Sequence, residues 1–127
     1  MPGKHFYEYA VIRLVPRVER EEFMNIGVIL YSKNAKYLNC RFHLDESKLR
    51  VLCTEIDLKD VKDNIQAFKK ICLGAVDGGP IAEWEIAERF RWLTAQKSAS
   101  LQTSRPHNGF TDDLEQTLLS IFEEQVL

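Results

Sequence analysis

Apolar residues form three dense runs in the first third of the chain, and their spacing predicts β-strands. Residues 6–16 and 23–31 carry aromatic and β-branched side chains at both alternating sets of positions, which is typical of strands covered on both faces. Residues 37–44 alternate strictly between an apolar set (Leu38, Cys40, Phe42 and Leu44) and a polar set (Asn39, Arg41 and His43). Because only short loops separate the three runs, we expect the three strands to be antiparallel neighbours. The polar set of the third strand indicates that helices do not fully cover both faces of the sheet.

The period changes to a helical one after residue 44. Residues 57–73 carry apolar side chains at steps of three and four, with Asp57 suited to the N-cap and Gly74 to the position after the last turn. The other expected elements are a short helix over 45–53, a helix over 81–95, a strand over 98–104, a turn over 105–109 and a last helix that begins at Thr111 or Asp112.

Strands that precede helices predict an α+β domain. We expect an antiparallel sheet of three to four strands with three to four helices packed on it, in two layers. A chain of 127 residues fits one compact domain over residues 1–127.

Composition and spacing argue against several functional classes. A net charge of −2 provides no general basic footprint, so nucleic acid is not an expected partner. The three cysteines contain no C-x-x-C pair, the three histidines show no metal-ligand spacing, and no glycine-rich phosphate loop is present, so we expect no metal and no cofactor. The chain has no signal-peptide pattern and no apolar run near the ~20 residues that span a bilayer, so we expect a cytoplasmic location without a membrane span.

The helix expected over 81–95 has the most unusual pattern of the chain. One face carries Ala82, Ile86, Phe90 and Leu93 and is suited to pack on the sheet. A second stripe carries Trp84, Glu88 and Trp92 and is bordered by Arg91. Tryptophan and arginine are enriched at binding hot spots, so these four residues are candidates for binding a partner. The alternatives are a ligand pocket, or cover for both tryptophans from the C-terminal helix or the loop at residues 77–80.

A second candidate site lies in residues 100–113. Ser104, Arg105 and His107 precede the last helix, whose N-terminal N–H groups favour an anion. An acid–base interpretation would pair His107 with Asp112 or Asp113, but acids at a helix start repel an anion and are typical caps. The anion-binding candidates are Arg13, Arg20, Arg105 and His107, and they require that the fold bring them together.

Asn25, Ile26 and Gly27 interrupt the second apolar run. A glycine inside a strand usually marks a bulge or a close approach of another element, and an asparagine amide can satisfy a backbone group that a bulge frees. We expect a bend here that brings a helix close to the sheet, with the helix of Trp84 and Trp92 as the candidate. The alternative is the edge of an active site.

Several motifs together resemble one known family. They are Y-x-Y-x-x-I-R at residues 7–13, R-x-E-F-x-N-I-G-V at 20–28, E-R-F-R-W-L at 88–93, and His107, Gly109 and Asp112 further on. This combination is similar to the bacterial domain-of-unknown-function family 3037 over nearly the whole chain, although residues 45–80 resemble it only in general character. No activity is assigned to that family. Its members look like small cytoplasmic proteins that are sometimes encoded next to a HipA-like kinase, and the resemblance therefore implies a protein partner.

These observations favour a non-enzymatic protein-interaction or regulatory module, because no convincing catalytic set accompanies the tryptophans and arginines of one helix. The alternative is an anion- or nucleotide-binding protein, including a phosphoryl-transfer or nuclease-like enzyme, that would use the anion-binding candidates together with Arg91. A third hypothesis is a homodimer formed through the sheet or through the tryptophan stripe.

Overall fold

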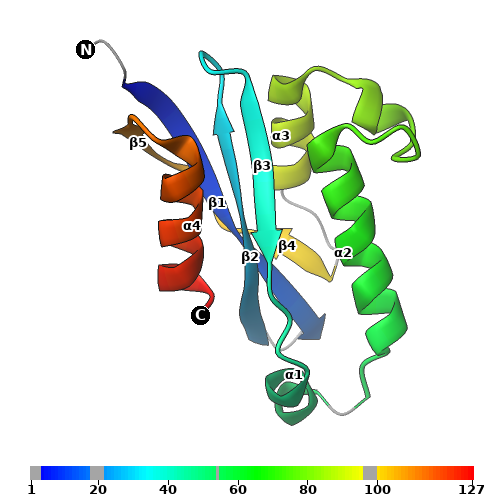
Figure 1. Cartoon of the computed structure of the whole chain (residues 1–127). Helices are drawn as coiled ribbons and strands as arrows, with labels where there is room; N and C mark the ends of the chain where they lie inside the picture. The colour runs from blue at the N-terminus through cyan, green and yellow to red at the C-terminus, as the bar shows by residue number, and fades with distance from the viewer. Residues whose placement is uncertain (1–3, 18–21, 54, 96–99) are drawn as a thin grey trace.

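Five strands form one open antiparallel sheet (Figure 1). The computed structural model describes residues 4–17, 22–53, 55–95 and 100–127. The strands are β1 (His5–Arg17), β2 (Glu22–Ser32), β3 (Tyr37–Phe42), β4 (Leu101–Thr103) and β5 (His107–Thr111). Their order is β3-β2-β1, and both β4 and β5 pair with the remaining edge of β1. The long strand β1 thus carries β5 along its first half and β4 along its second half.

Ser104 joins β4 to β5 without interrupting the hydrogen bonds of β1. Its N–H donates to the carbonyl of Val11 at 2.9 Å, and its hydroxyl accepts from the N–H of Val11 at 2.9 Å. Of the strand predicted over 98–104, residues 101–103 form β4, and residues 98 and 99 lie outside the described residues. The turn predicted over 105–109 is wrong because β5 begins at His107. The 13-residue strand β1 extends beyond β4, and pairing with its free backbone groups outweighs the local turn preference of Asn108 and Gly109.

The α-helices cover both faces of the sheet (Figure 1). α1 (Glu46–Leu52), α2 (Leu58–Leu73) and α3 (Ile86–Thr94) lie on one face, and α4 (Leu114–Gln125) lies on the other. Alternate residues of β2 divide between the two cores, since Ile29 packs with α2 and α3 while Val28 and Leu30 pack with α4. The α+β class, the antiparallel sheet and four helices are confirmed. The sheet has five strands instead of three to four, and the domain has three layers instead of two.

The helix caps agree with the sequence in two of three cases. The Asp45 carboxylate accepts the N–H of Lys48 at the start of α1, and Asp57 caps α2, which ends at Gly74 with a left-handed φ of 65°. α4 begins later than predicted, because Asp113 is its N-cap and Thr111 belongs to β5. The Asp113 carboxylate accepts the N–H of Gln116 at 3.0 Å.

The polar face of β3 is partly covered by α4, whereas Arg41 and His43 are exposed, so the expectation of a face that is not fully covered holds for part of the strand. The Tyr37 hydroxyl donates to the Glu115 carboxylate at 2.6 Å, and the Asn39 amide donates to the same oxygen at 3.4 Å. The Arg41 guanidinium lies over the Phe122 ring at 5.6 Å. Polar side chains on an alternating strand can therefore face a helix when that helix supplies hydrogen-bond acceptors and ring faces.

The interruption at Asn25–Gly27 is a β-bulge, as predicted. Ile12 pairs with Gly27 and Arg13 pairs with Asn25, so Ile26 has no partner on β1. The element that approaches Gly27 is β3 and not a helix: a Cβ there would lie 2.6 Å from the Arg41 carbonyl oxygen. Asn25 instead reaches α4, where its amide donates to the Gln125 carbonyl at 3.0 Å. The prediction that the helix of Trp84 and Trp92 lies over this bend is therefore wrong.

Candidate functional site

The helix predicted over 81–95 is divided into two pieces. A 3-10 turn, η2 (Pro80–Glu83), is followed by Trp84 and Glu85 in extended conformations, and α3 begins only at Ile86. Both pieces contact α2, and α3 contacts the sheet as well. The prediction of one continuous helix that carries both tryptophans on a single stripe is therefore wrong.

Trp84 belongs to an exposed apolar corner of the molecule. The corner consists of the last turn of α2, the loop over residues 74–79 and η2, and its close packing places Gly78 against Ala82. Leu73 is 61% exposed, Val76 is fully exposed and Trp84 is 43% exposed. We call Leu73, Val76 and Trp84 the Trp84 surface.

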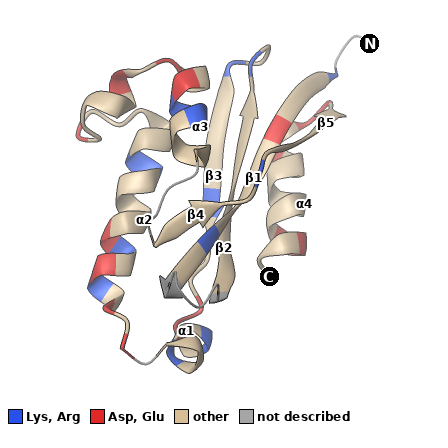
Figure 2. Ribbon diagram, turned by 180° about the vertical axis from the view of Figure 1, so that it is seen from behind, with Lys and Arg blue, Asp and Glu red and all other residues tan. Residues whose placement is uncertain are grey.

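Several acidic residues lie in this part of the chain, where segments of the ribbon are red in Figure 2. Asp77 forms an ion pair with Lys70 at 2.8 Å, and this pairing lowers the pKa of Asp77. Glu83, Glu85 and Glu88 are exposed and form no ion pair with any residue that the structure describes. The corner therefore combines apolar side chains with three carboxylates that have no described counter-ion.

Arg89 does not neutralise these carboxylates. Its guanidinium donates to the carbonyls of Ile71 at 3.1 Å and Cys72 at 3.2 Å, at the C-terminal end of α2. A cation at this position satisfies carbonyl groups that the last helical turn leaves free and complements the helix dipole. Arg89 thus holds α3 to α2, and the corner stays acidic.

The four predicted partner-binding residues do not share one surface. Trp84, Glu88 and Arg91 are exposed. Trp92 is half-buried against the core and lines a cavity of about 210 Å³ between α2 and α3, together with Phe68. Trp92 therefore belongs to the packing between α2 and α3, whereas Trp84 faces outward.

The anion-binding candidates are also separated. Arg20 lies outside the described residues. His107 is exposed on β5, where its ring stacks on Tyr9 with centroids 5.2 Å apart. Arg13 lies four residues beyond Tyr9 on β1, which corresponds to roughly 13 Å along the strand. Arg105 is exposed in the connection between β4 and β5.

The acid–base pair considered for His107 is not assembled. Asp113 is occupied as the N-cap of α4, and Asp112 is exposed. No hydrogen bond joins His107 to either acid within the described residues. The two acids are thus explained by the start of the helix.

Arg13 has surroundings that the sequence did not indicate. It is half-buried on the face of the sheet that carries α4, and its guanidinium lies over the Phe23 ring at 4.6 Å. The neighbours across the ladder are Asn25 on β2 and Gln102 on β4, so two amides flank it.

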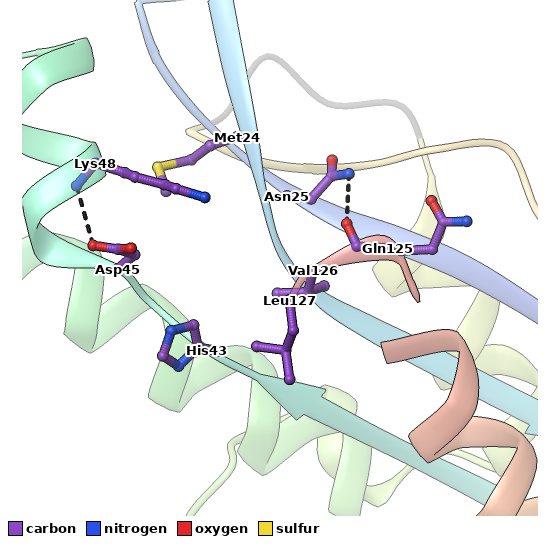
Figure 3. Close-up of a pocket in the computed structure, with 8 residues that line it drawn as sticks. All are labelled: Met24, Asn25, His43, Asp45, Lys48, Gln125, Val126 and Leu127. Carbon is purple, nitrogen blue, oxygen red and sulfur yellow. Dashed lines mark hydrogen bonds between the residues drawn. The ribbon is translucent and has the colours of Figure 1, made fainter. Parts of the chain in front are cut away.

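A polar cavity of about 490 Å³ lies beyond Asn25, at the end of α4 (Figure 3). Asn25, His43, Asp45, Lys48 and Gln125 supply polar side chains to it, and Met24, Val126 and Leu127 complete the lining. Asn25 was the only sequence signal for this site, because the other polar residues come from separate elements that only the fold joins. Within the described residues, no group of three His, Cys, Asp or Glu residues could hold a metal ion, and no helix is long and apolar enough to cross a membrane.

The chain belongs to the family "Protein of unknown function (DUF3037)", whose model matches residues 9–126. This match confirms the resemblance drawn from the motifs in β1, β2, α3 and β5. Comparisons with curated proteins and with solved structures find no match.

Proposed function

We propose that this member of the DUF3037 family is a protein-interaction module that binds a basic, amphipathic segment of a partner through the Trp84 surface. The observation that supports this most is the coincidence of three exposed apolar side chains with three carboxylates that lack a described counter-ion. Each feature alone is common on protein surfaces. Together they specify both the apolar and the charged character of a partner.

The apolar side chains of the Trp84 surface supply most of the affinity for the proposed partner. Full burial of one large apolar side chain contributes about 1.5–3 kcal/mol, and grouped exposed apolar residues mark interaction sites more often than scattered ones. Tryptophan is the residue type most enriched at hot spots. Trp84 therefore carries the largest share of the proposed contact.

The acidic rim supplies the selectivity. Glu83, Glu85 and Glu88 attract lysine and arginine side chains and repel acidic surfaces. A helix or extended segment with apolar residues on one side and cations beside them matches this arrangement. The family resemblance suggests a HipA-like kinase as the first partner to test.

Calorimetric titration tests the proposal with two probes: a HipA-like kinase, and a synthetic amphipathic peptide rich in lysine and leucine. We expect binding that weakens with added salt and that falls at least about tenfold for Trp84→Ala. Phe110→Ala is the matched control, because Phe110 is an exposed aromatic residue on β5, away from the Trp84 surface. Failure of both probes to bind the wild-type protein, or equal binding by Trp84→Ala, would overturn the proposal.

A further inference from the structure

We propose that the outer edge of β5 pairs with β5 of a second copy of this chain, so that the two sheets join into one across a two-fold axis at Gly109. The pairing is antiparallel, and its hydrogen bonds connect the main chains of Asn108 and Phe110 in the two protomers. This interface is separate from the Trp84 surface and does not depend on the function proposed for it.

β5 lies at one margin of the sheet, as Figures 1 and 2 show. Among the described strands it pairs with β1 alone. α4 follows β5 in the chain but packs mainly on β2 and β3, which lie on the other side of β1. The N–H and C=O groups along such an edge form a template for the main chain of another strand.

The hydrogen bonds of β1 identify the groups of β5 that face outward. Ser104 bonds to both main-chain groups of Val11, so Val11 and every second residue before it turn these groups toward β5. Their partners on β5 are His107, Gly109 and Thr111. Because main-chain groups alternate sides along a strand, the N–H and C=O of Asn108 and Phe110 point away from the sheet. The described residues supply no hydrogen-bond partner for these groups.

The outward groups are complementary to their own copies about Gly109. In an antiparallel pair centred on this glycine, Asn108 of one protomer faces Phe110 of the partner subunit, and the same pair recurs across the axis. Each pair exchanges N–H···O=C bonds in both directions, so the N–H and C=O of both residues obtain partners. The two Gly109 residues form the non-hydrogen-bonded pair between them, in which Cα atoms approach to about 4.5 Å.

Two phenylalanines supply apolar contact beside these hydrogen bonds. Phe110 is 69% exposed and its neighbour on β1, Phe6, is 39% exposed, and their rings lie edge to face with centroids 5.3 Å apart. In the proposed pairing the two copies of Phe110 share one face at diagonal positions, roughly 7–8 Å apart and within reach of aromatic rings. Association therefore buries rings that the single protomer leaves in water.

Charges at the two ends of β5 favour a second copy in this orientation. Arg105 precedes the strand and Asp112 follows it, and both are exposed without an ion pair to a described residue. Antiparallel pairing brings the Arg105 end of one protomer to the Asp112 end of its partner, so opposite charges meet at both ends of the interface. A parallel pairing would instead place like charges together.

The opposite edge of the sheet, along β3, is protected against such pairing. The Asn39 side chain accepts the N–H of Cys40 at 2.8 Å, so this outward N–H already has a partner within the chain. Arg41 places an exposed charge on the same strand. Charged side chains are one way in which proteins prevent edge-to-edge pairing. β5 contains no Asp, Glu, Lys or Arg, so its edge has no such protection.

The dimer should be weak, because a strand of five residues buries less surface than a standard interface of about 1,600 Å². Sedimentation velocity of the full chain, over concentrations from roughly 10 μM to 1 mM, measures its dissociation constant. We expect a reversible monomer–dimer equilibrium within this range.

Asn108→Pro removes an outward N–H that the dimer uses and the monomer does not. Proline is tolerated on a strand edge where its missing N–H faces solvent, so the variant should fold and its dissociation constant should rise at least about tenfold. Asn108→Thr is the matched control, because it keeps that N–H and should associate as the wild type does.

A mixed sample of isotope-labelled and unlabelled wild-type protein tests the register even if Asn108→Pro does not fold. We expect an intermolecular NOE between the Gly109 Hα protons, which face each other in a non-hydrogen-bonded pair. Intermolecular NOEs at β3 or at the Trp84 surface instead would overturn the proposal, as would equal association by Asn108→Pro and the wild type. A chain that stays monomeric throughout would also overturn it, and would leave the edge of β5 to an extended segment of another protein.

Discussion

At the scale of single residues, Gly27 shows how one position couples two strands. The bulge at Ile26 turns β2 so that β3 passes directly against the glycine. A side chain at residue 27 would meet both a backbone oxygen of Arg41 and the ring of Phe42. A backbone oxygen in a paired strand cannot move without loss of ladder hydrogen bonds.

Gly27→Ala should therefore destabilise the protein by about 1–3 kcal/mol in urea unfolding, as overpacking does. Gly109→Ala is the comparison. Its Cβ would lie 2.6 Å from the Tyr7 hydroxyl, the far end of a side chain that can rotate away. We expect a smaller loss of unfolding free energy for Gly109→Ala than for Gly27→Ala. Equal losses for the two variants would contradict the explanation that the Arg41 backbone oxygen limits the space at Gly27.

At the scale of elements, α4 shows how a helix start depends on the element before it. Thr111 and Asp112 are reasonable first residues by composition, but β5 retains Thr111 in its pairing with His5. The helix can begin only after the chain leaves the sheet, which makes Asp113 the cap.

Asp113→Ala should cost about 1 kcal/mol of unfolding free energy, because the N–H of Gln116 loses its acceptor. Asp112→Ala is a control matched in chemistry and sequence position, and it should change stability by less than about 0.5 kcal/mol. Chemical denaturation of the two variants checks this directly. A larger loss for Asp112→Ala would place the cap where the sequence alone suggested it.

At the scale of the whole molecule, α4 makes the stability of the domain sensitive to alkaline pH. Burial, and then the hydrogen bond to Glu115, raise the pKa of Tyr37 above its usual value. Burial likewise raises the pKa of Tyr7 and of Tyr31. A tyrosine whose pKa is raised in the folded state contributes stability that is fully present below the unfolded pKa of about 10 and is lost as pH rises beyond it.

We expect the free energy of unfolding to fall as pH rises above about 10, and to fall less steeply for Tyr37→Phe. Tyr37→Phe also loses a hydrogen bond at neutral pH, so the slope is the informative quantity. Glu115→Gln removes the charge that disfavours ionisation of Tyr37. The pH dependence of its unfolding free energy should therefore lie between that of the wild type and that of Tyr37→Phe. Parallel pH profiles for wild type and Tyr37→Phe would show that Tyr37 does not carry this dependence.

The sequence was informative wherever a local pattern decided the outcome. Asp45 and Asp57 cap the starts of α1 and α2, and Gly74 caps the end of α2, as predicted, because caps depend on backbone groups within a few residues. The division of the helix at Trp84 was not predictable in this way. Trp84 and Glu85 are extended, so that η2 packs on α2 while α3 packs on both α2 and the sheet, and local periodicity contains no information about these contacts.

The candidate site residues also divide into features that the local sequence indicates and features that depend on tertiary packing. Trp84 and Trp92 were both selected for their residue type, but Trp84 is exposed whereas Trp92 packs against the core. Arg13 was listed among anion-binding candidates for its charge alone. Its pairing with Asn25 and its position over the Phe23 ring follow from the register across the bulge.

The sequence by itself determined the α+β class, the first three antiparallel strands, the helix caps at Asp45 and Asp57, and the family. These features follow from periodicity, turn length and motifs, which involve residues near one another in the chain. Only the tertiary structure decided that α4 covers the second face and that β5 extends the edge of β1. Each of these depends on which surfaces remain unburied after the local elements form, and that is set by the packing of the whole chain.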